Sequence, residues 1–354
     1  MKLRYIVSVL LIVGLAATPV LSAEAPRTPN ELSNNVTWGG YYEFEYSDKE
    51  SISGDAGHGN FDVHRTILFF GVQPHERLRF FNELEIEHGS EFVGLEQSWL
   101  EFAINDNHNL RAGIDLIPVG RLNLKHDGNL RDFVFRPQMD GTLIPTTWYE
   151  SGIGFNGSIG KNISYQVGIS NGLNSADTEA LGDVSEFEAM IEDGGNLSEA
   201  DGNGSKAYWG RFVYSPMLGT DLAVSGYQTK YNAASSSQDN EITFAAFDFS
   251  HTQGPWDLKG EYVTVDKDQQ SGPGAGGSTV NGLKGGSGGY LEVGYHFFPS
   301  ALYNSFIARG FDNPTFTALA RYEDLTFDEA SSGAQTAERD YSYTSLGINY
   351  RPVE

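Results

Sequence analysis

The sequence contains no cysteine among its 354 residues, and basic residues are scarce. A chain without cysteine has no disulfide framework, no thiolate metal site and no cysteine nucleophile. Lys and Arg number 23 against 47 Asp and Glu, which gives a formal net charge of −24. Binding to nucleic acid needs clustered basic side chains that contact phosphates, so this charge excludes nucleic acid as a partner.

Long apolar runs are also missing after residue 23, where no stretch approaches the ~20 residues of a membrane-spanning helix. The first 23 residues differ from the rest and predict a secretory signal peptide. Lys2 and Arg4 supply positive charge, residues 6–17 are apolar, and 21–23 (Leu-Ser-Ala) offer a cleavage site. Removal of 1–23 leaves 21 basic residues against 47 acidic ones, a net charge of −26. An exported chain of this kind is either soluble or crosses a membrane as strands.

What the sequence has in abundance is glycine, 42 residues, and aromatic side chains, which make up 13% of the chain. Apolar and polar residues alternate with a period of two, the pattern of a strand with two different faces. Fourteen such segments can be recognised in the chain. They are 37–46, 61–72, 78–88, 97–104, 109–116, 149–159, 162–170, 206–215, 221–231, 241–251, 256–266, 289–298, 315–325 and 341–350.

The connections between these segments alternate in length. Short turns lie at 73–77, 105–108 and 216–220, whereas the polar connections at 171–205, 267–288 and 326–340 are long. Short turns at one end and long loops at the other are typical of outer-membrane barrels and not of soluble sandwiches.

The sequence therefore predicts an all-β fold, a single transmembrane antiparallel β-barrel of about 16 strands over residues 37–354. Residues 24–36 would form an N-terminal periplasmic segment. Because fourteen segments are recognisable where sixteen are expected, we predict that a C-terminal hairpin is missing from this chain. Closure of the barrel is required because an unpaired strand edge in lipid costs several kcal/mol per orphan group.

Motifs of catalysis and of metal binding are absent from the sequence. There is no G-x-S-x-G or H-E-x-x-H motif, and the Gly-rich residues 154–162 lack the Ser or Thr of a phosphate-binding loop. None of the eight His residues pairs with another at metal-ligand spacing. We expect no enzyme activity, no cofactor and no metal.

Acidic residues occur with a period of two on one predicted strand. Glu83, Glu85 and Glu87 share a face, and Glu101 lies on the inward face of a neighbouring segment. A carboxylate pair for acid–base chemistry is one interpretation, but a charged wall facing a water-filled lumen is the simpler one. The nine carboxylates of 177–201 are interpreted as a solvated external loop.

The basic residues gather in one stretch between two predicted strands. Residues 111–136 contain five basic side chains, opposed by Asp115, Asp127 and Asp132. Because 117–148 is too long for a turn, we predict that it folds into the lumen and narrows the channel. An ordinary external loop is the alternative. With one more arginine from a strand, the candidate pore-lining, anion-contacting residues are Arg79, Arg111, Arg121, Lys125, Arg131 and Arg136.

Three short motifs lie in or beside this stretch. Arg111-Ala112-Gly113 leads to Pro118-Val119-Gly120, Phe135-Arg136-Pro137 follows, and a strand begins at Glu150-Ser151-Gly152-Ile153-Gly154. In these motifs the sequence resembles the phosphate-selective porins O and P over residues 37–354. The resemblance implies a homotrimer of sixteen-stranded barrels, each with its own channel for phosphate or pyrophosphate. The mature chain departs from it in having only 8 Lys and 13 Arg.

We therefore expect an outer-membrane porin, a channel for passive diffusion of small hydrophilic solutes, with phosphate-type anions among them and a weak anion preference at best. Its partners would be outer-membrane lipid, lipopolysaccharide and two further copies of the chain. A general, cation-preferring or carbohydrate porin is the alternative within this class. A secreted β-rich binding protein is the alternative outside it.

Overall fold

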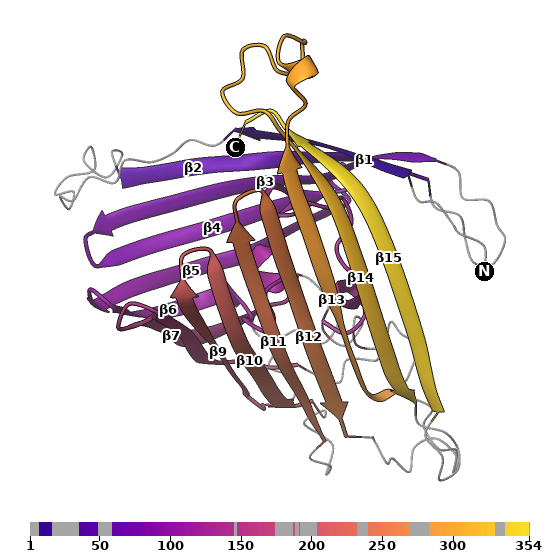
Figure 1. The fold of residues 1–354 in the computed structure, drawn as a ribbon. Coiled ribbons are helices and arrows are strands. Elements are labelled where there is room, and N and C mark those ends of the chain that lie inside the picture. The colour runs from indigo at the N-terminus through magenta and orange to yellow at the C-terminus, as the bar shows by residue number, and fades with distance from the viewer. Residues whose placement is uncertain are drawn as a thin grey trace. The chain divides into compact units, whose positions relative to one another are not determined.

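The computed structural model describes residues 7–15, 35–48, 59–144, 147–173, 187, 191, 204–231, 240–268, 283–329 and 337–353. The chain divides into two compact units. The first comprises Met1–Asp115 and Asp127–Val134, and the second comprises Leu116–His126 and Phe135–Glu354. Each unit is built from strands that pair antiparallel with their neighbours in sequence (Figure 1). Among the described residues, no helix has the length and apolar character needed to cross a membrane.

The first unit holds the strands up to β6, and each pairs with the next along the chain. Its strands are β1 (Val7–Leu15), β2 (Val36–Asp48), β3 (Asn60–His75), β4 (Leu78–Glu87), β5 (Phe92–Asn105) and β6 (His108–Leu116). The β4–β5 register shifts after Glu83, which pairs with Gln97, while Leu84 pairs with Leu95. Glu96 is thus the extra residue of a β-bulge, and its side chain is fully buried.

The second unit holds the remaining strands, again paired in sequence order. Its strands are β7 (Tyr149–Ile159), β8 (Ile163–Ser170), β9 (Ala207–Met217), β10 (Thr220–Lys230), β11 (Glu241–Gln253), β12 (Trp256–Lys267), β13 (Leu283–Phe297), β14 (Thr315–Glu329) and β15 (Ala337–Arg351). Short 3-10 helices occur at Asn123–Lys125, Gln138–Gly141 and Ser300–Leu302 in this unit, and at Gly128–Leu130 in the first.

All fourteen strands predicted from the alternation are present, as β2 to β15 of the described chain. β13 begins at Leu283, six positions before the predicted segment. The added residues contain Gly285, Gly286 and Gly288, which have no side chain to show an alternation. Residues 298–314 connect β13 to β14. They lie at the same ends of the strands as the short turns that follow β9 and β11, so the predicted rule that all turns at this end are short does not hold for this connection.

β1 lies inside the predicted signal peptide, and in the structure it pairs with β2, Val7 opposite Asp48. The signal peptide stays a prediction, and its removal would take β1 away and leave β2 at the edge of the sheet. Most of 24–36 and of the acidic loop 177–201 lies outside the described residues.

The strands of the second unit have one exposed apolar face. Four side chains opposite one another on β9 to β12 form a continuous row on it, each about half exposed to solvent. They are Phe212, Val224, Phe247 and Tyr262. An apolar band across the strands is what contact with lipid requires of a β-barrel.

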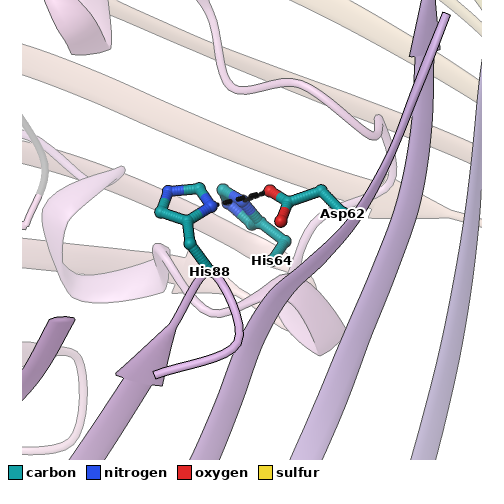
Figure 2. Close-up of side chains that lie close together, drawn as sticks. All are labelled: Asp62, His64 and His88. Carbon is teal, nitrogen blue, oxygen red and sulfur yellow. Dashed lines mark hydrogen bonds and ion pairs between the residues drawn. The ribbon is translucent and has the colours of Figure 1, made fainter. Parts of the chain in front are cut away.

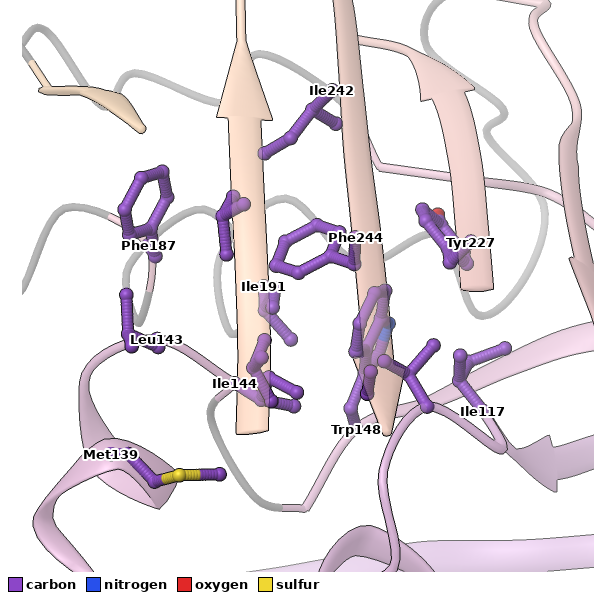
Figure 3. Packing of buried hydrophobic residues seen from close by; sticks show 14 of the residues in the cluster. Ile117, Met139, Leu143, Ile144, Trp148, Phe187, Ile191, Tyr227, Ile242 and Phe244 are labelled. Carbon is purple, nitrogen blue, oxygen red and sulfur yellow. The ribbon is translucent and has the colours of Figure 1, made fainter. Parts of the chain in front are cut away.

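The other face of the second unit is partly apolar as well. Here strand side chains pack against the connection between β6 and β7 (Figure 3). Trp148 is central, with ring centroids 4.5 Å from Tyr227 and 5.0 Å from Phe244. Further buried members of this core are Ile117, Val119, Met139, Leu143, Ile144, Phe187, Ile191, Ile242, Val263 and Val265.

Candidate functional site

Two wall carboxylates of the second unit bind the backbone of the β6–β7 connection. Oε2 of Glu261, on β12, accepts hydrogen bonds from the backbone N–H groups of Arg121 at 2.9 Å and Leu122 at 3.2 Å. Oε2 of Glu323, on β14, accepts one from the N–H of Gln138 at 2.6 Å. Carboxylates are strong acceptors for backbone N–H groups, so these bonds hold the connection against the strands.

Gly120 is required where the connection meets Glu261. Its φ is +68°, a left-handed conformation, and an added Cβ would lie 1.8 Å from Oε1 of Glu261. Its N–H donates to Oγ of Ser225 on β10 at 2.9 Å. The glycine thus lets the backbone approach the strands more closely than any other residue would.

Two wall arginines bind backbone carbonyl groups of the same connection. Arg211, on β9, donates to the carbonyl of Gly120 at 2.8 Å and makes a bidentate pair with Asp248 at 2.6 and 2.8 Å. Arg321, on β14, donates to the carbonyls of Phe135 and Arg136 at 3.0 and 3.1 Å. Sequence analysis did not single out either arginine, because their partners lie far away in the chain.

Glu150, at the start of β7, is fully buried and surrounded by donors. Its carboxylate accepts hydrogen bonds from the indole N–H of Trp148 at 3.0 Å and the hydroxyl of Tyr227 at 2.7 Å. The hydroxyl of Ser170 and the backbone N–H of Gly172 complete the set, at 2.5 and 3.0 Å. These bonds fix the end of the connection to β7, β8 and β10.

Three of the predicted anion-contacting residues lie in the second unit. Arg121 donates to the hydroxyl of Tyr290 at 3.3 Å, and Arg136 donates to the carbonyl of His126 at 3.3 Å and lies 3.7 Å from Asp140. Lys125 is exposed, and its ammonium group has no hydrogen bond or ion pair to any residue that the structure describes.

In the first unit, residues 127–134 of the connection contact β2. The hydroxyl of Tyr41 donates to Asp127 at 3.0 Å and accepts the N–H of Gly128 at 3.3 Å. Arg131, another predicted anion contact, donates to Oε1 of the fully buried Glu43 at 2.8 Å.

Glu101 brings together the other two predicted arginines. Arg79, on β4, donates to its Oε1 at 3.1 Å through Nε, and Arg111, on β6, donates to its Oε2 at 3.0 and 3.2 Å. Arg111 also pairs with Asp115 at 2.9 Å and lies 3.9 Å over the ring of Trp99. Both guanidinium groups therefore bind carboxylates of the protein itself.

The predicted acidic wall on β4 is paired in part. Glu83 accepts a hydrogen bond from Gln97 at 2.5 Å, while Arg65 on β3 makes ion pairs with Glu85 at 3.2 Å and Glu87 at 2.9 Å. Arg65 was missed by sequence analysis, although it belongs to an alternating segment. Six glutamates of this unit are buried on β2, β4 and β5: Glu43, Glu45, Glu83, Glu85, Glu96 and Glu101.

The structure thus joins Arg79, Arg111 and Glu101 in one cluster and places Arg131 beside Glu43 in the same unit. Arg121, Lys125 and Arg136 lie on the second unit's portion of the connection. The sequence predicts a single group of anion-contacting residues. The described contacts instead distribute these residues over several small clusters, in which most of the positive charges have a protein partner.

The folded chain is similar to solved structures of one outer-membrane protein. OmpT of Vibrio cholerae, expressed in the outer membrane, has a TM-score of 0.54 and 10% identity, covering 89% of this chain and 82% of that one. The same protein folded in vitro has a TM-score of 0.56 at 9% identity with the same coverage. The fold is that of an outer-membrane β-barrel. The predicted fold class is confirmed.

In sequence, the chain is 29% identical to an uncharacterized protein of Aquifex aeolicus (strain VF5), over 91% of this chain and 74% of that protein. No family model matches the chain. The resemblance to the phosphate-selective porins therefore stays a prediction.

Proposed function

We propose that the protein is a porin-type channel for passive diffusion of small hydrophilic solutes across the bacterial outer membrane. The observation that carries the proposal lies in the second unit. There Glu261 and Glu323 bind the backbone of Arg121, Leu122 and Gln138 on the charged strand face, opposite the face that carries the apolar row of Phe212, Val224, Phe247 and Tyr262. A barrel with lipid outside and a connection held against its charged inner wall forms a constricted water-filled pore.

Among small solutes, we propose a preference for cations over phosphate-type anions. Arg79, Arg111 and Arg131 each bind a glutamate, and the first unit buries six glutamates on its strands. A pore's field is set by its nearest charges, because charges more than about 8 Å away are screened at physiological salt. Paired arginines add little net positive field, so this arrangement supports the cation-preferring alternative over weak anion preference.

The test is conductance across planar bilayers that contain the purified protein, with a KCl gradient between the two sides. We expect channel openings. Their reversal potential should be shifted from zero toward the equilibrium potential of potassium. The absence of any conductance from folded protein would contradict the channel. A reversal potential shifted toward the equilibrium potential of chloride, together with block of the chloride current by phosphate, would contradict cation preference. It would support the phosphate-selective interpretation instead.

We also propose how the chain is processed, located and assembled. We propose that the chain is processed after residue 23, that 24–36 is periplasmic, and that the barrel lies in outer-membrane lipid and lipopolysaccharide as a homotrimer. Mass spectrometry of protein extracted from outer membranes should find Glu24 at the N-terminus. Chemical cross-linking in mild detergent should give trimers, and monomers alone would contradict the assembly.

A further inference from the structure

Two histidines far apart in sequence lie opposite each other at one end of the β3–β4 pair. The backbone N–H of His88 donates to the carbonyl of His64 at 3.2 Å, directly beyond the pair Arg65 and Glu87. Cross-strand neighbours of this kind have side chains on the same face of the sheet. The alternation of the sequence does not reveal the pair, because 24 positions separate the two residues.

Asp62 lies on β3 two positions before His64, and its carboxylate lies close to both imidazoles. The pairing of β3 with β2 is irregular here: Glu43 pairs with Arg65, but Glu45 pairs with Asp62, so β3 has one residue more than β2 in this interval. A β-bulge of this kind bends the strand and changes the direction of side chains locally. His88 itself has a φ of +47°, and Gly89 that follows has +67°, so the chain turns sharply just where the imidazole is presented. Non-glycine residues with positive φ are uncommon and cluster at functional sites.

The two imidazoles lie beside one carboxylate oxygen of Asp62 (Figure 2). Oδ2 of Asp62 lies 2.7 Å from Nδ1 of His88 and 3.5 Å from Nδ1 of His64. One potential ligand atom from each of the three residues lies within 4.8 Å of the other two. Nδ1 of His64 is buried and makes no well-aligned hydrogen bond within the described chain. The side chains remain 20–44% exposed, so an ion can reach them from solution.

We propose that Asp62, His64 and His88 bind a divalent transition-metal ion of the zinc type. Two imidazoles and one carboxylate are the ligand set of three-coordinate protein sites for Zn²⁺, whose fourth position stays open to water or another ligand. Tetrahedral coordination with metal–ligand distances of ~2.0–2.1 Å places ligand atoms ~3.3 Å apart.

The surrounding charges favour a cation. Glu43 and Glu45, from β2, act on His64 with their negative charge, and Arg65 opposes them. Arg65 is itself engaged by Glu85 and Glu87, which reduces its repulsion of an ion at this site. Hard cations such as Ca²⁺ prefer sites built from oxygen atoms, so the imidazoles select against them.

The experiment is a zinc titration of the full chain without a histidine tag, folded in detergent micelles and freed of metal with a chelator. A chromophoric chelator that competes for ZnCl₂ should report one zinc ion bound per chain, and excess CaCl₂ should not displace it. Each of His64→Ala and His88→Ala should weaken zinc binding at least about tenfold, the lower range for disturbing a metal site's ligand shell. Co²⁺ at the same site should give visible absorption bands of tetrahedral coordination.

The matched control is His75→Ala, because His75 is an exposed histidine at the opposite end of the same strand. It should bind zinc as the unmodified chain does. Equal weakening in the control, or unchanged affinity in both site variants, would overturn the proposal. Heat-modifiable migration in detergent gels verifies that each variant is folded, so loss of binding cannot be confused with loss of the barrel. The zinc site does not depend on the proposed channel, since binding and conductance are measured separately.

Discussion

The two units use charged residues on their strands in different ways. In the first unit, strand charges bind mainly one another, as Glu101 does with Arg79 and Arg111. In the second unit, Glu261 and Glu323 bind backbone N–H groups of the connection between β6 and β7. The same alternating pattern therefore gives mainly pairs between strand side chains in one unit and anchors for the backbone of a long connection in the other. A charged strand face predicts an aqueous wall only where no other part of the chain covers it.

The largest expected effect comes from Glu150→Ala in the second unit. Four buried donors, among them Trp148 and Tyr227, would lose their acceptor, and each buried unsatisfied group costs about 1–3 kcal/mol. The temperature at which the folded, fast-migrating form disappears in detergent gels should fall strongly.

Glu101→Ala is the comparison in the first unit. It should lower this temperature less, because the Arg79 side chain is 51% exposed and regains water. An equal or larger decrease for Glu101→Ala would show that the pairs of the first unit are as important for stability as the anchors of the second.

A second variant, Glu261→Ala combined with Glu323→Ala, removes anchors but leaves the strands paired. Hydrogen bonds to charged groups contribute about 1.5–3 kcal/mol each, so local opening of residues 118–141 should become at least about tenfold more frequent. We expect faster cleavage of this segment by added protease and larger single-channel conductance.

Glu85→Ala is the matched change in the first unit, since Glu85 pairs with Arg65 on a neighbouring strand. It should leave cleavage between 118 and 141 unchanged. Protease resistance of the double variant equal to that of the unmodified chain would contradict the anchoring role.

The smallest effect is expected from Arg121→Ala combined with Lys125→Ala. The Arg121 guanidinium donates to the hydroxyl of Tyr290, and the exposed Lys125 has no ion pair within the described residues. Their removal should move the reversal potential in a KCl gradient slightly further toward potassium. Lys161→Ala, in the exposed β7–β8 turn, removes one positive charge elsewhere and should have no effect. If this control shifted the reversal potential by the same amount, the residues that determine ion selectivity would lie outside the connection.

The strands could be predicted from sequence because their signal is local. Alternation identified β2 to β15, although the ends of several strands differ from the predicted bounds. The largest difference is at the start of β13, where glycines carry no side chain. The anchors could not be predicted in this way, because a residue such as Glu323 gives no local sign of its partner Gln138.

One signal in the connection was available and not used. The apolar residues Ile117, Val119, Leu143, Ile144 and Trp148 lie in a stretch judged by its charges alone. So many apolar residues in a connection indicate that it packs against other parts of the protein and is not solvated. The convergence of His64 and His88 was hidden for a different reason, because it needs the pairing of two strands and a bulge.

The anchoring of the connection also imposes an order on folding. Leu122 and Glu261 are 139 residues apart, and Gln138 and Glu323 are 185 apart. Contacts over such separations form late, because the loops that they close are long. The connection is synthesised before its binding surface on β12 and β14 exists, so it must wait until these strands pair. During refolding into micelles, shielding of Trp148 from an added fluorescence quencher should follow the appearance of strand signal. In the proposed channel, the narrowing by the connection would therefore be built last, after the strands have paired.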